Sequence, residues 1–269
     1  MALSHTREGS GEPLVLIHGL GGSKRVWMPV IDRLADEREV IAVDMPGFGN
    51  SPPLADGVAP SAANLGAAVS AHCAALGIER PNVAGNSLGG WAALEIAKAA
   101  GAATVCAISP AGLWRDPLGP RAYDSHATAR KLRPVLGVLI RSKRIRDSLL
   151  RTTVARPQNL SRDEAKAVIY DWLNSTGYGV ANAEMRSHVF ENPELITVPT
   201  TIAWGTEDRL VRAPKPERMP PGTRYIELEG LGHTPTWDDP QAIAELLLEA
   251  SSQTAASGRS SPGHEPVAR

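Results

Sequence analysis

The chain has 269 residues, of which 42% are hydrophobic and 21% charged, so it can build a full core and wholesale disorder is excluded. Its formal net charge of −1 gives no reason to expect a nucleic acid as a partner. The sequence shows no run as apolar and long as a membrane span and no signal-peptide pattern, so we expect a soluble cytoplasmic protein. Cys73 and Cys106 lie in apolar surroundings and are expected to be buried thiols, which suits a reducing compartment.

The first part of the chain alternates short apolar runs with helical patterns, which is typical of parallel strands joined by helices. The segment before Leu14 has space for one weak strand and hardly for two. We expect strands at 14–18, 39–44, 81–85 and 104–109, and helices at 26–36, 61–76 and 90–100.

This alternation stops after residue 109 and resumes near residue 200. Helical periodicity fills the intervening stretch, from about Pro134 and again at 161–173, without a convincing strand. Strands at 200–205 and 224–230 and a helix at 240–250 complete the pattern. We therefore expect a core of residues 1–113 and 191–250, a helical cap of residues 114–190, and a disordered tail of residues 251–269.

One hydroxyl group lies among an unusual number of glycines, in VAGNSLGGW at 83–91. An apolar run precedes Ser87 and a helical pattern follows it, while Gly85, Gly89 and Gly90 flank it. A strand that turns sharply into a helix has little room for side chains, so glycines are needed around the apex. The turn would expose Ser87 at a helix N-terminus, as a nucleophile requires.

A nucleophilic serine needs a base and an acid that orients the base. His233 follows a predicted strand within LEGLGHTPTWDDP, and Asp208 follows another within WGTEDRLV, so both fall on the edge that carries Ser87. Glu207 and Asp116 are the alternative acids. Two backbone N–H groups would hold the oxyanion, and we assign them to Leu20, in the glycine-rich HGLGGS loop, and to Leu88.

Five motifs in this order, HGLGG, DMPGFGNS, GNSLGG, WGTEDRLV and GLGHTPTWDDP, resemble the α/β-hydrolase family with a helical cap. The resemblance extends from about residue 14 to residue 250, outside the cap. It implies the α/β-hydrolase fold, a mostly parallel twisted sheet with helices on both faces and a helical cap insertion. It also implies that Ser87, Asp208 and His233 form the catalytic triad and that the N–H groups of Leu20 and Leu88 form the oxyanion hole. The family commonly begins with two antiparallel strands, whereas this chain has space for one.

Several other side chains near the predicted strand ends have a structural or a functional interpretation. His18 and Asp44 are expected to brace the loops in which they lie. Trp27, Trp204 and Trp237 are expected to brace loops as well. The residues predicted to line the substrate pocket are Gly21, Trp91, Trp114 and Trp172.

The stretch from residue 115 to residue 190 is basic. It holds 14 Lys and Arg against 7 Asp and Glu, a net charge of +7, which leaves −8 for the rest of the chain. Many of the cations alternate with Leu136, Ile140, Leu149 and other apolar residues in RPVLGVLIRSKRIRDSLLR at 133–151. Such a helix can rest on an anionic membrane or receive an acidic substrate. We instead expect a cap helix that packs its apolar residues over the pocket and leaves its arginines in water.

The function expected is a serine hydrolase that cleaves small or medium carboxylic esters or lactones through an acyl-enzyme, without a metal or another cofactor. The alternative is a carbon–carbon bond hydrolase acting on the ring-fission (meta-cleavage) products of aromatic catabolism. That reaction needs a cap arginine, for which Arg186 or Arg130 is a candidate. Cofactor-free perhydrolysis and a non-catalytic ligand receptor are further alternatives. The oligomeric state is not readable from the sequence.

Overall fold

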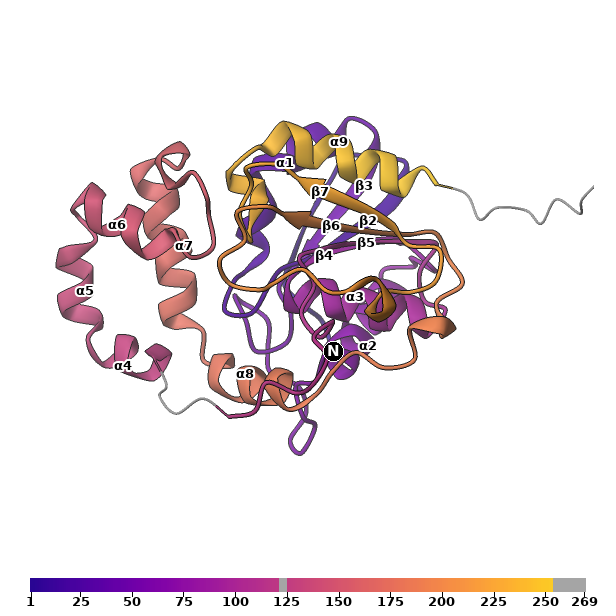
Figure 1. Ribbon diagram of the computed structural model, residues 1–269, viewed down its shortest axis with the longest axis horizontal. Coiled ribbons are helices and arrows are strands. Elements are labelled where there is room, and N and C mark those ends of the chain that lie inside the picture. Colours follow the sequence, from indigo (N-terminus) through magenta and orange to yellow (C-terminus); the bar gives the residue numbers. More distant parts are fainter. Residues whose placement is uncertain (121–124, 254–269) are drawn as a thin grey trace, which may run out of the picture.

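The computed structural model describes residues 1–120 and 125–253 of the chain. Seven strands form one sheet in the order β1-β3-β2-β4-β5-β6-β7 (Figure 1). The strands are β1 (His5–Glu8), β2 (Glu12–Ile17), β3 (Arg38–Val43), β4 (Asn82–Asn86), β5 (Thr104–Ile108), β6 (Thr200–Gly205) and β7 (Arg224–Leu228). β1 runs antiparallel to β3, and the other neighbouring strands are parallel. The expected α/β fold and the single strand before β2 are confirmed.

The central strands match the apolar runs of the sequence because they are covered on both faces. Every residue of β4, β5 and β6 is buried. The expected limits of the six strands from β2 onward agree with the observed ones to within about two residues. Their parallel direction brings all their carboxyl ends to one edge of the sheet.

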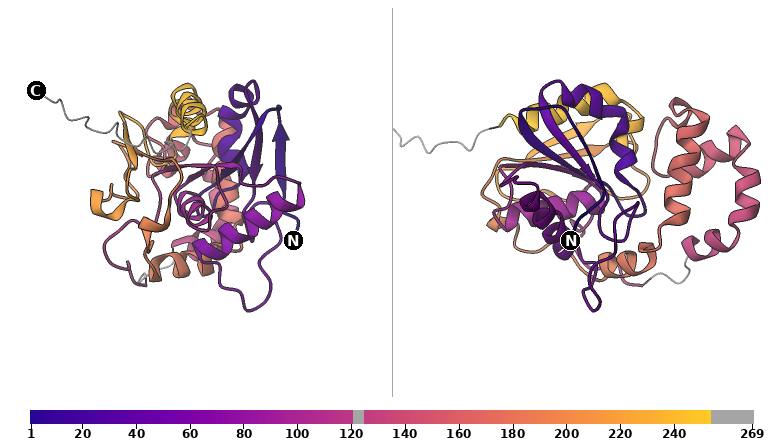
Figure 2. Two further views of the ribbon diagram at one scale, coloured as in Figure 1. Left: turned by 90° about the vertical axis from the view of Figure 1, so that its right-hand side faces the viewer. Right: turned by 180° about the vertical axis from the view of Figure 1, so that it is seen from behind.

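Four helices cover the two faces of the sheet (Figures 1 and 2). On one face lie α1 (Met28–Ala35) and α9 (Pro240–Ser251), and on the other lie α2 (Ala62–Ala75) and α3 (Leu88–Lys98). Alternate residues of β2 pack into opposite layers, because successive side chains of a strand point to opposite faces of the sheet. Leu14 and Leu16 belong to the apolar cluster beneath α1 and α9, whereas Val15 and Ile17 belong to the one beneath α2 and α3.

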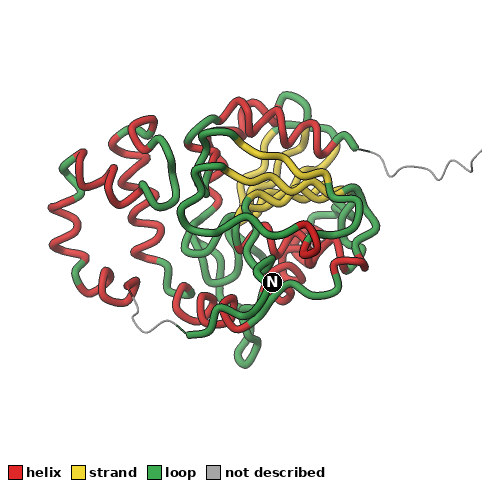
Figure 3. The backbone as a smooth tube through the Cα atoms, viewed as in Figure 1, coloured by secondary structure: helices red, strands yellow, loops and turns green. Residues whose placement is uncertain are grey.

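Residues 114–190 lie between β5 and β6, and we call them the insertion. The regular elements in the described part of the insertion are all helices (Figure 3). They are α4 (Ser125–Lys131), α5 (Arg133–Leu139), α6 (Lys143–Leu150), α7 (Arg162–Asn174) and α8 (Tyr178–Ser187). The helices expected near Pro134 and at 161–173 are therefore confirmed. The division into core and cap units stays a prediction, and residues 254–269 of the expected tail lie outside the described residues.

The expected packing of the basic stretch 133–151 is wrong for several of its apolar residues, although most of its arginines are exposed as expected. The stretch forms two helices, α5 and α6, which are separated by a turn at 140–142. Ile140 is fully buried and Leu136 is partly buried, because these two face α7. A two-turn helix can offer only one face to a neighbour, so its other apolar residues are left in solvent. The large apolar residues that are exposed in the stretch and at its N-cap are Leu132, Val135, Val138, Leu139 and Leu149.

The insertion has an apolar cluster of its own, which Trp237 and Val26 from outside the insertion join. Ile140, Leu150, Ile169 and Leu173 pack together with Trp237, which lies after β7. None of the described helices is long and apolar enough to cross a membrane.

The two cysteines are free and buried, as expected. Burial raises the pKa of the Cys73 thiol to about 11 and that of the Cys106 thiol to about 12. Both thiols are therefore protonated at neutral pH.

Candidate functional site

Ser87 lies at the apex of the turn from β4 into α3. Its backbone has φ 57° and ψ −119°, a conformation that residues other than glycine rarely adopt. A Cβ atom on Gly85 would collide with the carbonyl of Gly89, so the turn requires glycine there. Hydrogen bonds hold the strained backbone, since the Ser87 N–H donates to the Ile108 carbonyl at 2.9 Å and the Ser87 carbonyl accepts from Trp91 and Ala111 at 3.0 Å each.

His233 and Asp208 come from the ends of two other strands and are joined directly. Nδ1 of His233 lies 2.7 Å from Oδ2 of Asp208, and both side chains are almost fully buried. Burial opposes ionisation of Asp208, but the bond to His233 and the N–H groups of Val211 and Leu210 outweigh it and hold the pKa of the carboxyl below its usual value. An ionised carboxylate only accepts hydrogen bonds, so Nδ1 of His233 carries a proton, and in the neutral imidazole the lone pair then lies on Nε2.

The alternative acids lie elsewhere. Glu207 is half exposed and pairs with Arg209 at 3.0 Å, and Asp116 is exposed beside Arg115 at 3.7 Å. Among the described residues Nε2 of His233 is buried and has no hydrogen-bond partner. A buried ring nitrogen without a partner can accept a hydrogen bond from water, a ligand or a reacting hydroxyl group.

Asn86, which precedes Ser87, fixes the backbone of His233 beside the turn. Its side-chain Nδ2 donates to the His233 carbonyl at 2.8 Å and to the Ile108 carbonyl at 3.1 Å. The amide thereby connects the ends of β4 and β5 with the loop that carries His233. This contact brings the backbone of His233 next to Asn86, the residue that precedes Ser87.

The loop after β2 passes over Ser87 and is oriented by His18. The Gly19 carbonyl accepts from Nδ1 of His18 at 2.7 Å and from the Gly22 N–H at 3.1 Å. In a trans peptide the N–H of Leu20 points the opposite way from that carbonyl. A Cβ atom on Gly19 would lie 3.1 Å from Cβ of Ser87, so Gly19 lies against the serine.

The second expected donor, the N–H of Leu88, opens the first turn of α3, where helical N–H groups lack partners within the helix. His18 is fully buried, which lowers its pKa despite the bond to Gly19, and its Nε2 accepts from the Met45 N–H at 3.0 Å. His18 is thus a neutral brace between two loops, as expected.

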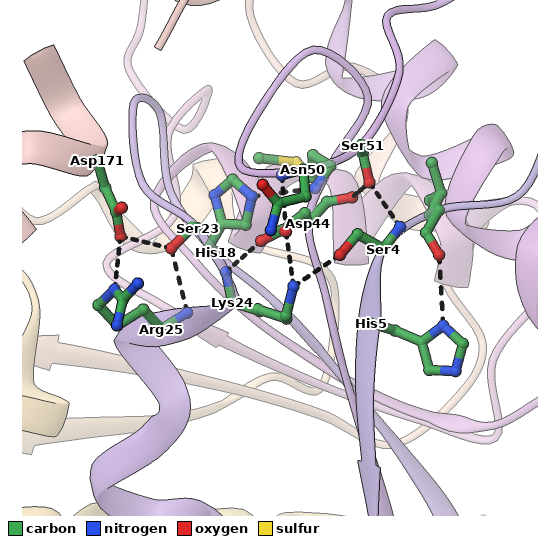
Figure 4. Close-up of polar contacts among 12 residues, drawn as sticks. Ser4, His5, His18, Ser23, Lys24, Arg25, Asp44, Asn50, Ser51 and Asp171 are labelled. Carbon is green, nitrogen blue, oxygen red and sulfur yellow. Dashed lines mark hydrogen bonds and ion pairs between the residues drawn. The ribbon is translucent and has the colours of Figure 1, made fainter. Parts of the chain in front are cut away.

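A polar network holds the loops after β2 and β3 together (Figure 4). Asp44 accepts from the N–H and Nζ of Lys24 at 2.7 and 2.8 Å and from the Asn50 N–H at 3.0 Å. Burial opposes ionisation, but these bonds outweigh it and keep the pKa of Asp44 below its usual value. The expected structural role of Asp44 is confirmed.

The same network reaches the insertion. Oδ2 of Asp171, on α7, accepts from Oγ of Ser23 at 2.6 Å and from Nε of Arg25 at 3.1 Å (Figure 4). The loop that carries Leu20 therefore has a polar connection to α7.

The structure separates the four predicted pocket residues into two pairs. Gly21 lies against Trp172, since a Cβ atom on Gly21 would come 2.8 Å from Cδ1 of Trp172 and from Cδ2 of Tyr178. Trp91 and Trp114 instead pack edge to face with each other, with ring centroids 5.9 Å apart. Nε1 of Trp91 reaches Glu95 at 3.0 Å, one helical turn further from Ser87.

Sequence reasoning missed the aromatic partners of Trp172. Tyr178 stacks on His126 with centroids 4.2 Å apart, and Nε2 of His126 donates to the Trp172 carbonyl at 2.8 Å. Neither residue has a motif that would reveal it. Arg186, considered for binding a substrate carboxylate, donates to the carbonyls of Gly119 and Leu118 at 2.8 and 3.2 Å.

Asp238 ties the insertion to the loop of His233 and was also missed. Its buried carboxylate accepts from the N–H groups of Gly232 at 2.8 Å, Arg156 at 2.6 Å and Ala155 at 3.1 Å. The Thr234 N–H donates to the Thr153 carbonyl at 2.7 Å. The loop of His233 is thus held on both sides by the segment that follows α6, on one side through Asp238. No group of three or more His, Cys, Asp or Glu side chains within the described residues could hold a metal ion.

The model of the "Alpha/beta hydrolase family" matches residues 14–246 of this chain. The chain belongs to the α/β-hydrolase family. Its fold and motif order thus have one explanation, and it is a hydrolase of the α/β type.

Two relatives and one solved structure illustrate the range of this hydrolase family. The "Dihydrolipoyllysine-residue acetyltransferase component of acetoin cleaving system" of Cupriavidus necator is 27% identical over 239 residues, which are 85% of this chain and 61% of that protein. "Epoxide hydrolase EphH" of Mycobacterium tuberculosis is 30% identical over 185 residues, or 64% of this chain and 86% of the relative. The structure of the "enol-lactonase from Burkholderia xenovorans LB400" superposes with a TM-score of 0.73 at 19% identity, covering 93% of this chain and 96% of the other. This last likeness shows the fold alone.

Proposed function

We propose that this hydrolase cleaves carboxylic esters or lactones by acyl transfer to Ser87. His233 takes the proton of the Ser87 hydroxyl on Nε2, and the alkoxide attacks the substrate carbonyl. The N–H groups of Leu20 and Leu88 bind the oxyanion. The alcohol leaves with the proton of His233, and water, activated in the same way, releases the acid and regenerates Ser87. These steps require no metal or organic cofactor.

The observation that supports this proposal best is the state of His233. Its Nδ1 donates to Asp208 at 2.7 Å while its buried Nε2 has no partner among the described residues. This leaves Nε2 available to accept a proton, at the edge of the sheet where a strained turn places Ser87 at a helix N-terminus. His18, by contrast, uses both ring nitrogens in hydrogen bonds to the loops that it braces.

The chemistry of a serine nucleophile favours esters over epoxides. An alkoxide that opens an epoxide forms an ether, which has no carbonyl for water to attack, so the enzyme could not turn over. An acyl-serine, by contrast, is hydrolysed by the same base and oxyanion donors that formed it.

The carbon–carbon bond hydrolase is less well supported. It would need a free cation to bind a substrate carboxylate, whereas Arg186 binds two backbone carbonyls and Arg130 lies exposed on α4. The cap role of residues 114–190, with Gly21 and Trp172 lining the pocket, and the cytoplasmic location are further parts of the proposal.

The test is hydrolysis of p-nitrophenyl esters from acetate to decanoate by the wild type, Ser87→Ala and Ser109→Ala. Ser109 is a matched control because it is also buried, follows the neighbouring strand β5 and has a positive φ of 44°. We expect Ser87→Ala to lower kcat by at least about 10³-fold and Ser109→Ala to leave it within a few-fold.

Turnover that survives in Ser87→Ala would overturn the proposed nucleophile. Turnover of a dienoate ring-fission product but of no ester would instead establish the carbon–carbon alternative. Binding without turnover of either substrate would identify a receptor.

A further inference from the structure

The outermost helix of the insertion exposes a continuous apolar surface. Leu132, Val135, Val138 and Leu139, which we call the α5 patch, are 51%, 57%, 60% and 42% exposed. Their spacing of three and four residues puts them on one face of the helical stretch. The other face, with Leu136 and Ile140, is the one that packs against the rest of the insertion. The patch therefore remains exposed to solvent, because α5 packs through its other face.

α5, which carries the patch, lies at the edge of the molecule that is farthest from the sheet, and α7 lies between it and the core (Figures 1 and 2). Leu136 and Ile140 pack toward α7, so the patch on the other side points away from the core. The exposed residues do not line the candidate site and are not explained by ester hydrolysis.

Exposed cations flank the patch along the chain, with no acidic residue among them in the sequence. From residue 125 to residue 146 the chain contains no Asp or Glu. The exposed cations within this stretch are Arg130, Lys131, Arg133, Arg141, Lys143 and Arg144. Lys143 pairs with Asp147 at 2.6 Å, which lies just beyond the stretch.

A groove beside the patch adds a second feature that favours an anionic partner. Arg133, Gly137, Arg141 and Tyr170 line it, and the guanidinium carbon of Arg133 lies 5.9 Å from the centre of the Tyr170 ring. Two guanidinium groups at the rim of an open groove suit a phosphate group, which they can bind through paired hydrogen bonds.

We propose that the α5 patch and its cations form a docking surface for an anionic lipid membrane. The four aliphatic side chains enter the boundary between headgroups and acyl chains, and the cations pair with lipid phosphates. The protein then lies on the membrane rather than across it. This inference concerns binding and does not depend on the proposed ester chemistry.

The charge and shape of the surface argue against other occupants. A second copy of the chain would bring two sets of like charges together, and four side chains bury far less than the roughly 800 Å² per partner of a stable interface. A protein partner would need a groove shaped to a protruding helix, whereas a lipid surface adapts to it.

The experiment is co-sedimentation with vesicles of phosphatidylcholine alone and of phosphatidylcholine with phosphatidylglycerol. We expect the full chain to pellet with the anionic vesicles at low salt, to stay in solution with the neutral ones, and to be released at about 0.5 M NaCl. Val135→Asp/Val138→Asp should weaken binding at least about tenfold. Arg141→Gln/Arg144→Gln should reduce the salt dependence.

Val58→Asp/Leu195→Asp is the matched control, because these side chains are 43% and 56% exposed outside the insertion. It should bind as the wild type does. Circular dichroism and ester turnover of each variant distinguish a lost surface from a lost fold, because none of these residues touches the candidate site.

Equal pelleting with both kinds of vesicle, or full binding by Val135→Asp/Val138→Asp, would overturn the proposal. So would the absence of pelleting with anionic vesicles, which would leave an acidic protein as the occupant. If the wild type self-associates on a sizing column and the double variant does not, the patch is a contact between copies and the membrane proposal is wrong.

Discussion

The sheet and the insertion use their apolar residues in different ways. Every residue of β4, β5 and β6 is buried, whereas α5 buries none of its own. The sheet is therefore a fixed frame, and the ends of its strands can hold side chains to the precision that acyl transfer needs. The insertion is built around a small cluster of its own and leaves surface available for contacts with other molecules.

The two regions meet at a few contacts near the candidate site. Trp172 lies over Gly21, Asp171 binds Ser23 and Arg25, and Asp238 binds the backbone of the segment after α6. The groups proposed to do chemistry belong to the sheet side of this boundary. We therefore expect changes in the sheet's loops to act on kcat and changes in the insertion to act on substrate choice.

The largest effect should come from Asp208→Asn, on the sheet side. An amide N–H in place of the carboxylate would donate to Nδ1 of His233, which forces the proton onto Nε2 and removes the base. We expect kcat to fall about 10⁴-fold with KM changed only a few-fold. Glu207→Gln, one residue away and exposed, is the control and should retain activity. A fall of kcat in both variants would mean that a change in the loop, rather than the loss of the Asp208 carboxylate, lowers the activity.

A smaller effect, of a different kind, is expected from Trp172→Ala in the insertion. Removing the indole opens space above Gly21, so longer acyl chains should be accepted while kcat on the acetate ester stays within a few-fold. The measurement is kcat/KM along the p-nitrophenyl ester series. Trp114→Ala, from the other pair of tryptophans, should leave the chain-length profile unchanged. The opposite pattern would show that Trp91 and Trp114 line the pocket.

The smallest effect is expected on the free energy of unfolding at acid pH, through the network that holds the loops after β2 and β3. The pKa of Asp44 is lowered by folding, so its contribution is present above the unfolded value of about 4 and is lost as the pH falls through the folded value. Asp44→Asn should cost about 2 kcal/mol at pH 7 and flatten the dependence of unfolding free energy on pH below about 4. Urea unfolding between pH 3 and pH 7 measures both quantities. Parallel curves for the two proteins would contradict this account.

Sequence reasoning succeeded where a residue's surroundings follow from its local pattern. The strands were predictable because a buried parallel strand is an apolar run, and Ser87 because a sharp turn requires Gly85 and Gly89. The pairing of His233 with Asp208 was predictable because both follow strands whose carboxyl ends meet at one edge of the sheet.

Two residues that the sequence did not reveal act on backbone groups. Asn86 binds the carbonyl of His233, and Asp238 binds the N–H groups of Gly232 and Arg156. Backbone groups are the same at every position, so their partners have no signature in the sequence. The exposed face of α5 was not predictable for another reason. Its apolar spacing is also that of a packed helix, and only the arrangement of the insertion shows which face is left over.

The most direct test of the central claim, that His233 and Asp208 activate Ser87, is reaction with a fluorophosphonate followed by mass spectrometry of the digested protein. The serine oxygen attacks phosphorus, fluoride leaves, and the phosphonyl group stays on the side chain that attacked. We predict one adduct, on Ser87, in the wild type and Ser109→Ala, and a rate of formation at least about 10³-fold lower in Asp208→Asn. An adduct on another residue, or one that forms at the wild-type rate in Asp208→Asn, would contradict it.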